Sequence, residues 1–369
     1  MTTAILVLNA GSSSVKFAVF PEDRGEEPLL SGAVGRIGGN ASVSILPAGG
    51  ERKSEGVDAP THAAALAVLA TKLASHLPDA TITGIGHRVV HGGALYSEPV
   101  VVDDGVLASL DTLTPLAPLH LPQGLEGIRT ARALFPNARQ IGCFDTAFHA
   151  EKPWLHNSFA LPQSYYDAGL RRYGFHGLSC QSILRGLRDE GYPVADRKFV
   201  IAHLGNGCSA TAVLGGKGHA TTMGFSALDG LIMGTRCGQI DPGVLLYWMG
   251  QGKSAEEIET LLYRQSGLLG LSGLSNDMRD LEQSDDPAAA RAIEAFVARA
   301  VEEICRLAGT MGGLDAVVFC GGIGENAASI RDRIMAGLTF LSSPEMLVRP
   351  TREELEIALS VRNLLSRAT

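Results

Sequence analysis

The feature that most constrains the fold is a strand–turn–strand pattern that occurs twice, almost two hundred residues apart. In the first half, apolar residues 4–8 and 15–20 flank a turn that runs from Asn9 to Ser14. In the second half, residues 199–204 and 208–214 flank the turn Gly205-Asn206-Gly207. Apolar runs around a short glycine turn predict β-hairpins. Their repetition predicts a duplicated domain in which each copy is built on a mixed sheet.

A second glycine-rich segment follows a short apolar strand late in the chain. Residues 316–320 read as the strand, Gly321–Asn326 as a turn, and the residues up to Leu338 as a helix. This order brings backbone N–H groups to a helix N-terminus, which suits phosphate or nucleotide. The other predicted elements are strands at 29–37, 41–46 and 219–223, and helices at 62–77, 288–307 and 353–365.

The length and composition of the chain limit the classes of protein to which it can belong. A chain of 369 residues exceeds the size at which one hydrophobic core stops growing, so two domains with a cleft are expected. The net charge of −8 without a basic block disfavours binding to nucleic acid or an anionic membrane. The six cysteines form no CxxC pair, and neither a signal peptide nor a run of ~18 apolar residues is present. We therefore expect a cytoplasmic protein.

The first hairpin turn offers phosphate ligands. Residues 9–16 supply a glycine, three hydroxyl groups, the amide of Asn9 and the ammonium of Lys16. The segment is not a P-loop, because Lys16 follows the serines and lies on a strand. An ordinary polar turn remains the alternative interpretation.

Two arginines could clamp an anion. Arg88 lies at the end of a short apolar strand, before a double glycine, and Arg236 lies in a loop held by glycines and a proline. Cationic groups supply much of the stabilisation in phosphoryl transfer, and the planar guanidinium also fits a carboxylate. A surface salt bridge is the alternative for Arg88. Asp241 is either a metal ligand or, before Pro242, a turn former.

Two further side chains could act on the substrates. Asp145 ends an apolar strand and could orient or deprotonate an acceptor, whereas His176, between Phe175 and Gly177, could donate to phosphoryl oxygens. A structural histidine is the alternative. The chain contains neither GxSxG nor HExxH, and the late glycine segment lacks the acidic residue of a dinucleotide fingerprint, which disfavours a dehydrogenase.

Taken together, the motifs closely resemble those of the acetate kinase family, in the acetate and sugar kinase, chaperone ATPase and actin superfamily. The resemblance runs nearly end to end. It rests on NAGSSSVK at 9–16, HRVVHGG at 87–93, LAPLH at 116–120, FDTAFH at 144–149, RRYGFHG at 171–177, HLGNG at 203–207, GLIMGTRCGQIDPG at 230–243, SNDMRDL at 275–281 and GGIGEN at 321–326.

The resemblance implies an α/β protein of two duplicated ribonuclease-H-like domains around a central cleft. The N-terminal domain would comprise residues 1–148 plus about 354–369, and the nucleotide-binding domain residues 149–353. It implies reversible transfer of the ATP γ-phosphoryl group to acetate, giving acetyl phosphate and ADP. It also implies Mg²⁺, with Mn²⁺ as a substitute, and a homodimer.

Site residues follow from the same motifs. The resemblance assigns catalysis to Asp145, His176 and Arg236, and binding of the substrate to Arg88, Val90, Leu119, Phe175 and Ala227. It assigns ATP binding to Ser12, Ser14, Lys16, His203, Leu204, Gly205, Asn206, Gly207, Asp277, Met278, Arg279, Gly322, Ile323, Gly324, Glu325 and Asn326. It assigns the metal to Asn9 and Glu353, with Glu354 as the neighbouring alternative because the chain is short between residues 340 and 349.

This sequence departs from the family pattern at the acyl pocket. Ala227 replaces the usual proline, which predicts a wider pocket and use of propionate beside acetate. Leu121 and Cys180 also differ from the family, at positions without central chemistry. The order of expected substrates is acetate, propionate and butyrate. A nucleotide-driven protein of the actin type, without a small-acid pocket, is the alternative from another class.

Overall fold

The structure, a computed structural model, describes residues 2–11, 13–23, 25–118 and 120–367. The chain divides into two compact units. The first unit comprises Met1–Ala147 with Arg352–Thr369, and the second comprises Phe148–Thr351. Two predicted site residues, Ser12 and Leu119, lie outside the described residues.

The first unit is built on a mixed sheet with the strand order β5-β4-β3-β2-β1-β6-β8-β7. The central strand β1 (Thr2–Ala10) pairs antiparallel with β2 (Ser14–Pro21) and parallel with β6 (Ala80–Val89). Strand β6 in turn pairs parallel with β8 (Arg139–Phe144). The remaining strands are β3 (Leu30–Gly35), β4 (Ser42–Pro47), β5 (Lys53–Gly56) and β7 (Val100–Val101).

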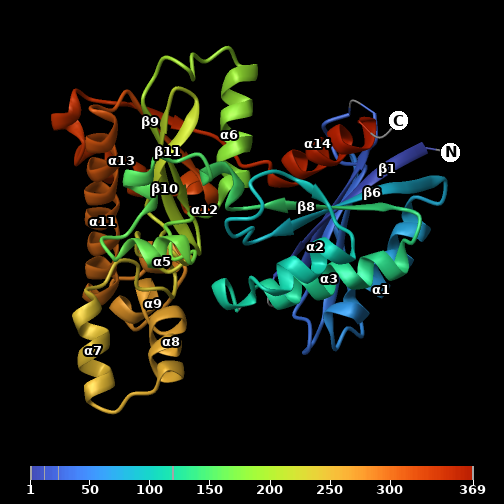
Figure 1. The fold of residues 1–369 in the computed structure, drawn as a ribbon, viewed down its shortest axis with the longest axis horizontal. Helices are drawn as coiled ribbons and strands as arrows, with labels where there is room; N and C mark the ends of the chain where they lie inside the picture. Colours follow the sequence, from blue (N-terminus) through green and yellow to red (C-terminus); the bar gives the residue numbers. More distant parts are fainter. Residues whose placement is uncertain (1, 12, 24, 119, 368–369) are drawn as a thin grey trace. The chain divides into compact units, whose positions relative to one another are not determined.

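Helices cover both faces of this sheet. On one face lie α1 (His62–His76), α2 (Asp104–Asp111) and α3 (Leu121–Leu134), and on the other lies α14 (Glu353–Ser366) (Figure 1). Helix α14 packs closely on β6 because Gly86 of this strand has no side chain. A Cβ at Gly86 would lie 2.3 Å from Ile357 Cγ2. The close fit holds the N-terminus of α14 beside the end of β6, where Arg88 lies.

The second unit repeats the same topology. Its sheet has the order β11-β10-β9-β12-β13. Strand β9 pairs antiparallel with β10 and parallel with β12, which is parallel to β13. This is the order and direction of β3-β2-β1-β6-β8, so the predicted duplication is confirmed. The strands are β9 (Phe199–Leu204), β10 (Cys208–Leu214), β11 (Lys217–Thr221), β12 (Ala316–Cys320) and β13 (Glu345–Val348).

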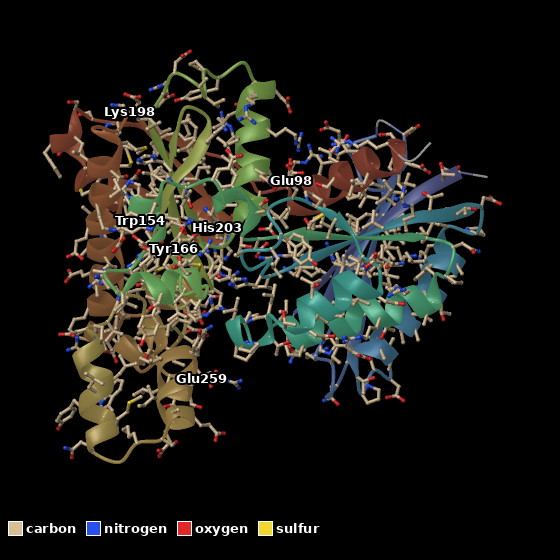
Figure 2. All side chains as sticks on the ribbon, viewed as in Figure 1. Glu98, Trp154, Tyr166, Lys198, His203 and Glu259 are labelled. Atoms are coloured by element: carbon tan, nitrogen blue, oxygen red, sulfur yellow. The ribbon has the colours of Figure 1, made fainter. Side chains whose placement is uncertain are left out.

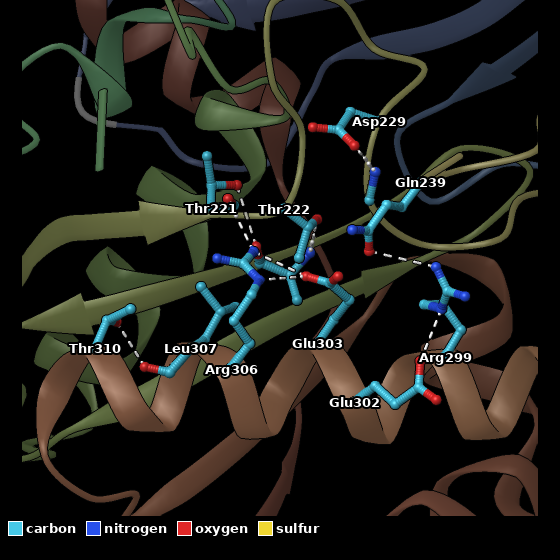
Figure 3. A network of polar contacts seen from close by, with 12 residues as sticks. Thr221, Thr222, Asp229, Gln239, Arg299, Glu302, Glu303, Arg306, Leu307 and Thr310 are labelled. Carbon is cyan, nitrogen blue, oxygen red and sulfur yellow. Dashed lines mark hydrogen bonds and ion pairs between the residues drawn. The ribbon is translucent and has the colours of Figure 1, made fainter. Parts of the chain in front are cut away.

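Two long helices sandwich the second sheet (Figure 1): α6 (Gly177–Asp189) on one face and α11 (Pro287–Met311) on the other. A polar network joins α11 to the sheet and to the loop beyond it (Figure 3). Within α11, Arg306 Nε donates to the buried carboxylate of Glu303. Arg306 Nη2 also donates to the carbonyl oxygen of Thr221 on β11 at 3.4 Å, while Arg299 donates to Gln239 Oε1 at 3.4 Å. This network ties one end of the loop that carries Arg236 to a rigid helix.

The remaining short elements surround this core. They are η1 (Thr114–Leu116), η2 (Ala147–His149), α4 (Trp154–Asn157), α5 (Gln163–Asp167), α7 (Pro242–Gly250), α8 (Ala255–Arg264), α9 (Gly267–Ser272), α10 (Met278–Glu282), α12 (Gly321–Asn326), α13 (Ala328–Ala336) and η3 (Thr339–Leu341). Within the described ranges, no helix has the length and apolar character needed to cross a membrane.

The predicted strands and helices are found, with two corrections. Gly321–Asn326 is not a turn but the helix α12, which starts directly after β12 because Gly321 makes the bend at φ 77°. Helix α11 is longer than predicted, since Asp286 caps its N-terminus and Gly312 ends it at φ 67°.

Candidate active site

Parallel strands bring three candidate side chains to one edge of the first sheet. Asn9 follows the last β1–β6 pair, Leu8 with His87, and Arg88 pairs with Cys143 two residues before Asp145. The carboxyl ends of parallel strands share one edge, where ligands of α/β proteins bind. The β1–β2 register also sets Asn9 opposite Lys16.

Arg88 and Asp145 form a bidentate pair. Arg88 Nε lies 2.9 Å from Asp145 Oδ1, and Nη2 lies 2.6 Å from Oδ2. Glu353, the first residue of α14, places Oε2 3.5 Å from Arg88 Nη1. We call these three residues the Arg88 cluster. One cation faces two carboxylates in it.

Burial and charge oppose one another in this cluster. Burial raises the pKa of Asp145, and the guanidinium of Arg88 works against that shift. Burial also disfavours the charged guanidinium, but the carboxylates of Asp145 and Glu353 outweigh it and raise the pKa of Arg88 above its usual value. Arg88 is therefore a cation whose orientation is held by two carboxylates.

The oxygen donors beside Arg88 fit a divalent cation. The described residues contain no ready-made group of three or more His, Cys, Asp and Glu side chains that could hold a metal. Mg²⁺ nevertheless suits such a site, because it keeps several waters and binds through one or two protein oxygens plus substrate phosphates. The amide of Asn9 and the carboxylate of Glu353 are donors of this type.

A backbone hydrogen bond closes the turn of the first hairpin. Gly11 N donates to the carbonyl oxygen of Ser14 at 2.8 Å. Lys16 is exposed on β2, so its ammonium can reach a ligand without first breaking a buried contact.

In the second unit, His176 is held by two neighbouring strands. Its Nδ1 lies 3.0 Å from Ser209 Oγ, and its ring stacks on His203 with centroids 4.3 Å apart. Ser209 and His203 are partners across β10 and β9. These contacts turn His176 Nε2 toward Gly207, where a Cβ would lie 3.5 Å from it.

Arg236 approaches the same glycine turn. A Cβ on Gly207 would lie 3.7 Å from Arg236 Nη1. This nitrogen donates to the carbonyl oxygen of Ala227 at 2.9 Å. Among the residues that the structure describes, no carboxylate pairs with Arg236. Burial lowers its pKa, yet arginine stays charged. A half-buried cation without an anion is costly, which suits it to an anionic ligand. We call His176, His203, Ser209 and Arg236 the His176 cluster.

A pocket of about 610 Å³ opens at the glycine turn between β9 and β10. We call it the Asn206 pocket. Its volume is that of a small-molecule site. It is lined by Gly205, Asn206, Asn276, Asp277, Met278, Arg279, Glu282, Gly322, Ile323, Asn326 and Ala327. The turn, α10 and α12 therefore supply its walls.

Eight of the predicted ATP-binding residues line this pocket. Several others do not. Leu204 is buried in the sheet, Gly324 packs on Phe319, and Glu325 Oε1 accepts from Gly321 N at 3.0 Å at the start of α12. These three shape the backbone around the pocket.

The acyl-pocket candidates are found in both units. Val90 is half-buried in the first unit. In the second, Phe175 is buried directly before His176, and the carbonyl of Ala227 holds Arg236. Asp241 is a cap rather than a free ligand, because its Oδ1 accepts from Gly243 N at 2.8 Å at the start of α7.

Some neighbours of these groups were not predicted from the sequence. Ser209 was overlooked, although a hydroxyl in a buried apolar strand signals a hydrogen-bond partner. Asn276 was also overlooked; its Nδ2 donates to Asn206 Oδ1 at 3.2 Å. Met233, whose Sδ lies 3.7 Å from Arg236 Nη1, carried no signal in the sequence.

Comparison with known proteins connects both units to one family. The acetokinase family matches residues 4–350. The acetate kinase of Methylocella silvestris is 49% identical over 354 residues, covering 92% of this chain and 88% of that protein. The acetate kinase of Rhodopseudomonas palustris strain TIE-1 is 44% identical, covering 99% of both.

Solved structures agree. A propionate kinase from Francisella tularensis superposes with a TM-score of 0.91 at 37% identity, covering 98% of this chain and 99% of that one. The acetate kinase of Porphyromonas gingivalis gives a TM-score of 0.88 at 32% identity, covering 98% of this chain and 100% of that one.

Proposed function

This chain belongs to the acetokinase family, and we propose that it performs that family's reaction with the residues described above. It is an ATP-dependent carboxylate kinase. It transfers the γ-phosphoryl group of ATP reversibly to acetate, giving acetyl phosphate and ADP. The unit Phe148–Thr351 is proposed as the nucleotide-binding domain, with the adenosine of ATP in the Asn206 pocket.

One observation carries the proposal. Arg236, a cation with no carboxylate partner among the described residues, and His176 Nε2 both approach Gly207, in the turn that also borders the Asn206 pocket. Loose phosphoryl-transfer transition states spread charge over three equatorial oxygens. Hydrogen-bond donors that are already in position before the substrate binds stabilise this charge without any rearrangement of the protein. An unpaired arginine beside a glycine turn is suited to that charge.

Arg88 is proposed to bind the acetate carboxylate. A carboxylate is already ionised at pH 7, so the acceptor needs no strong base. Asp145 then orients Arg88 through its bidentate bond and balances charge as the acceptor oxygen attacks. The bond to the leaving ADP oxygen breaks as the acetyl–phosphate bond forms. Positioning and neutralisation supply the catalysis, and no covalent enzyme intermediate is required.

Asn9 and Glu353 are proposed to hold Mg²⁺, for which Mn²⁺ can substitute. When bound, the ion neutralises phosphate charge and orients the γ-phosphoryl group. Glu353 is preferred over Glu354 because it contacts Arg88 directly. The phosphates of ATP are assigned to Ser12, Ser14, Lys16 and the turn from His203 to Gly207.

Acetate is the proposed acceptor, with propionate as the alternative. Val90, Leu119, Phe175 and Ala227 are assigned to its methyl group. The small side chain of Ala227 leaves room for one more methylene. A propionate kinase among the structural neighbours is consistent with this alternative.

A homodimer is proposed through α7. This helix reads PGVLLYWMG, yet none of the residues described in it is buried. Leu246 and Tyr247 are 70% and 64% exposed. An exposed apolar surface of this kind is typical of a protein–protein interface. Because the resemblance is to a dimeric family, we propose that a second copy of this chain covers α7. Trp154, which packs on Tyr166 (Figure 2), adds a further exposed apolar ring to this unit.

A cytoplasmic location is proposed, in agreement with six free cysteines. A hydroxamate assay with ATP, Mg²⁺ and acetate, propionate or butyrate tests the function. We expect acyl hydroxamate with acetate, and less with propionate. ATP hydrolysis without acyl phosphate from any acid would instead favour an actin-type ATPase.

A further inference from the structure

Two buried basic side chains lie behind the His176 cluster and have no role in the proposed reaction. His149 and Lys152 are 1% and 5% exposed. His149 Nε2 lies 2.8 Å from the carbonyl oxygen of Phe175. Lys152 Nζ donates to the carbonyl oxygens of Tyr173 at 2.7 Å and His149 at 2.8 Å. Both therefore contact the backbone that leads directly into His176.

That backbone has a demanding conformation. Gly174 has φ 82°, and His176 has φ 57° and ψ 28°, in the left-handed region. A residue other than glycine occupies this region only when the surrounding structure holds it there. His176 is the N-cap residue of α6. Its backbone conformation sets the direction of the Cα–Cβ bond and therefore determines where its imidazole points.

His149 packs directly against this turn. A Cβ on Gly174 would lie 2.8 Å from His149 Cγ, so only glycine lets the ring approach so closely. The acceptor on Phe175 is a carbonyl, so Nε2 of His149 must carry the proton of that hydrogen bond. Burial lowers the pKa of His149 to about 3, in agreement with a neutral ring.

The second ring nitrogen of His149 lowers the stability of the fold, so stability alone does not explain a histidine at this position. Nδ1 is buried and has no hydrogen-bond partner among the described residues. A buried acceptor left unsatisfied is a cost that an apolar side chain of similar size would avoid. The hydrogen bond to Phe175 is what the imidazole provides in return.

We propose that His149 and Lys152 are positioning residues, which hold the Tyr173–His176 backbone in its left-handed turn and so aim His176 at the transferring phosphoryl group. This inference rests on the role proposed above for His176. His149 lies four residues after Asp145, so one short segment of chain carries both an acid of the Arg88 cluster and the support of His176.

Three variants test the inference. His149→Leu removes the donor, and His149→Gln keeps an N–H donor of similar reach. His219→Leu is the matched control, because His219 Nε2 lies 3.1 Å from the carbonyl oxygen of Thr310, on a helix that carries no catalytic residue. We expect His149→Leu to lower kcat roughly 10²-fold with the KM for ATP nearly unchanged. His149→Gln should recover most of that loss, and His219→Leu should keep wild-type kcat.

A double-mutant cycle separates positioning from general damage. If His149 acts through His176, His149→Leu should cost almost nothing further in a His176→Ala background. A full further loss there, an equal loss in His219→Leu, or wild-type kcat in His149→Leu would each overturn the inference. If His149→Leu does not fold, Lys152→Met takes its place in the same cycle, with Lys152→Arg as the variant that keeps donors. Wild-type kcat in His176→Ala alone would instead refute the proposed role of His176.

Discussion

Replacing Arg236 by alanine removes the cation on which the proposed transfer most depends, with little damage to the fold. The guanidinium has no carboxylate partner among the described residues, so the substitution leaves no anion unpaired. It loses the 2.9 Å bond to the carbonyl of Ala227, and a hydrogen bond from a charged donor contributes about 1.5–3 kcal/mol. Relief of the buried charge offsets part of that loss. We expect the free energy of unfolding to fall by less than about 2 kcal/mol.

The kinetic effect should be far larger. Arginines that meet the charge of a transferring phosphoryl group contribute about 10³–10⁵ in kcat. That range equals about 4–7 kcal/mol of transition-state stabilisation. Because the contact between Arg236 and the transferring group should strengthen only in the transition state, the KM for ATP should change only a few-fold.

The assay is hydroxamate formation across a range of ATP concentrations, with thermal unfolding measured on the same preparations. Arg279→Ala is the matched control. Arg279 lines the Asn206 pocket with a side chain that is 79% exposed, so its loss should raise the KM for ATP and leave kcat near wild type. A change confined to the KM in Arg236→Ala, or a loss in kcat below about tenfold, would refute the transition-state role.

Other predictions follow from single contacts. Ala227→Pro should narrow the acyl pocket and lower kcat/KM for propionate relative to acetate, by roughly tenfold for one methylene; an unchanged ratio would contradict this. His87 is buried and its pKa is lowered to about 4, so its stabilising contribution, complete above pH 6.5, should be lost as the pH falls to 4. Between pH 6.5 and pH 4, the free energy of unfolding measured with urea should fall by about 3 kcal/mol less in His87→Gln than in the wild type. Tyr247→Asp should yield monomers by light scattering, whereas Leu95→Asp, on an equally exposed residue of the first unit, should not.

Much of the fold was readable from local patterns. The hairpin at residues 4–20 and its counterpart at 199–214 each consist of apolar runs that end at glycine or asparagine, and both form as predicted. Such signals depend on neighbours in the chain, so no tertiary information is needed to detect them. The helical conformation of Gly321–Asn326 was not predicted, because its three glycines favour a turn and the segment becomes helical through packing on β12.

The sequence by itself determined which chemistry is available: two arginines, an aspartate and a histidine at the ends of strands or in glycine loops, in the order of one family. Only the tertiary structure decided which atoms meet. Arg88 reaches Glu353 from more than 260 positions away in the chain, and Asn276 reaches Asn206 across 70. Ser209 selects the nitrogen of His176 that faces Gly207, and His149 supports the backbone behind it. Hydrogen bonds are directional and short-ranged, so a sequence pattern carries them only after strand order and register have brought the partners within about 3 Å.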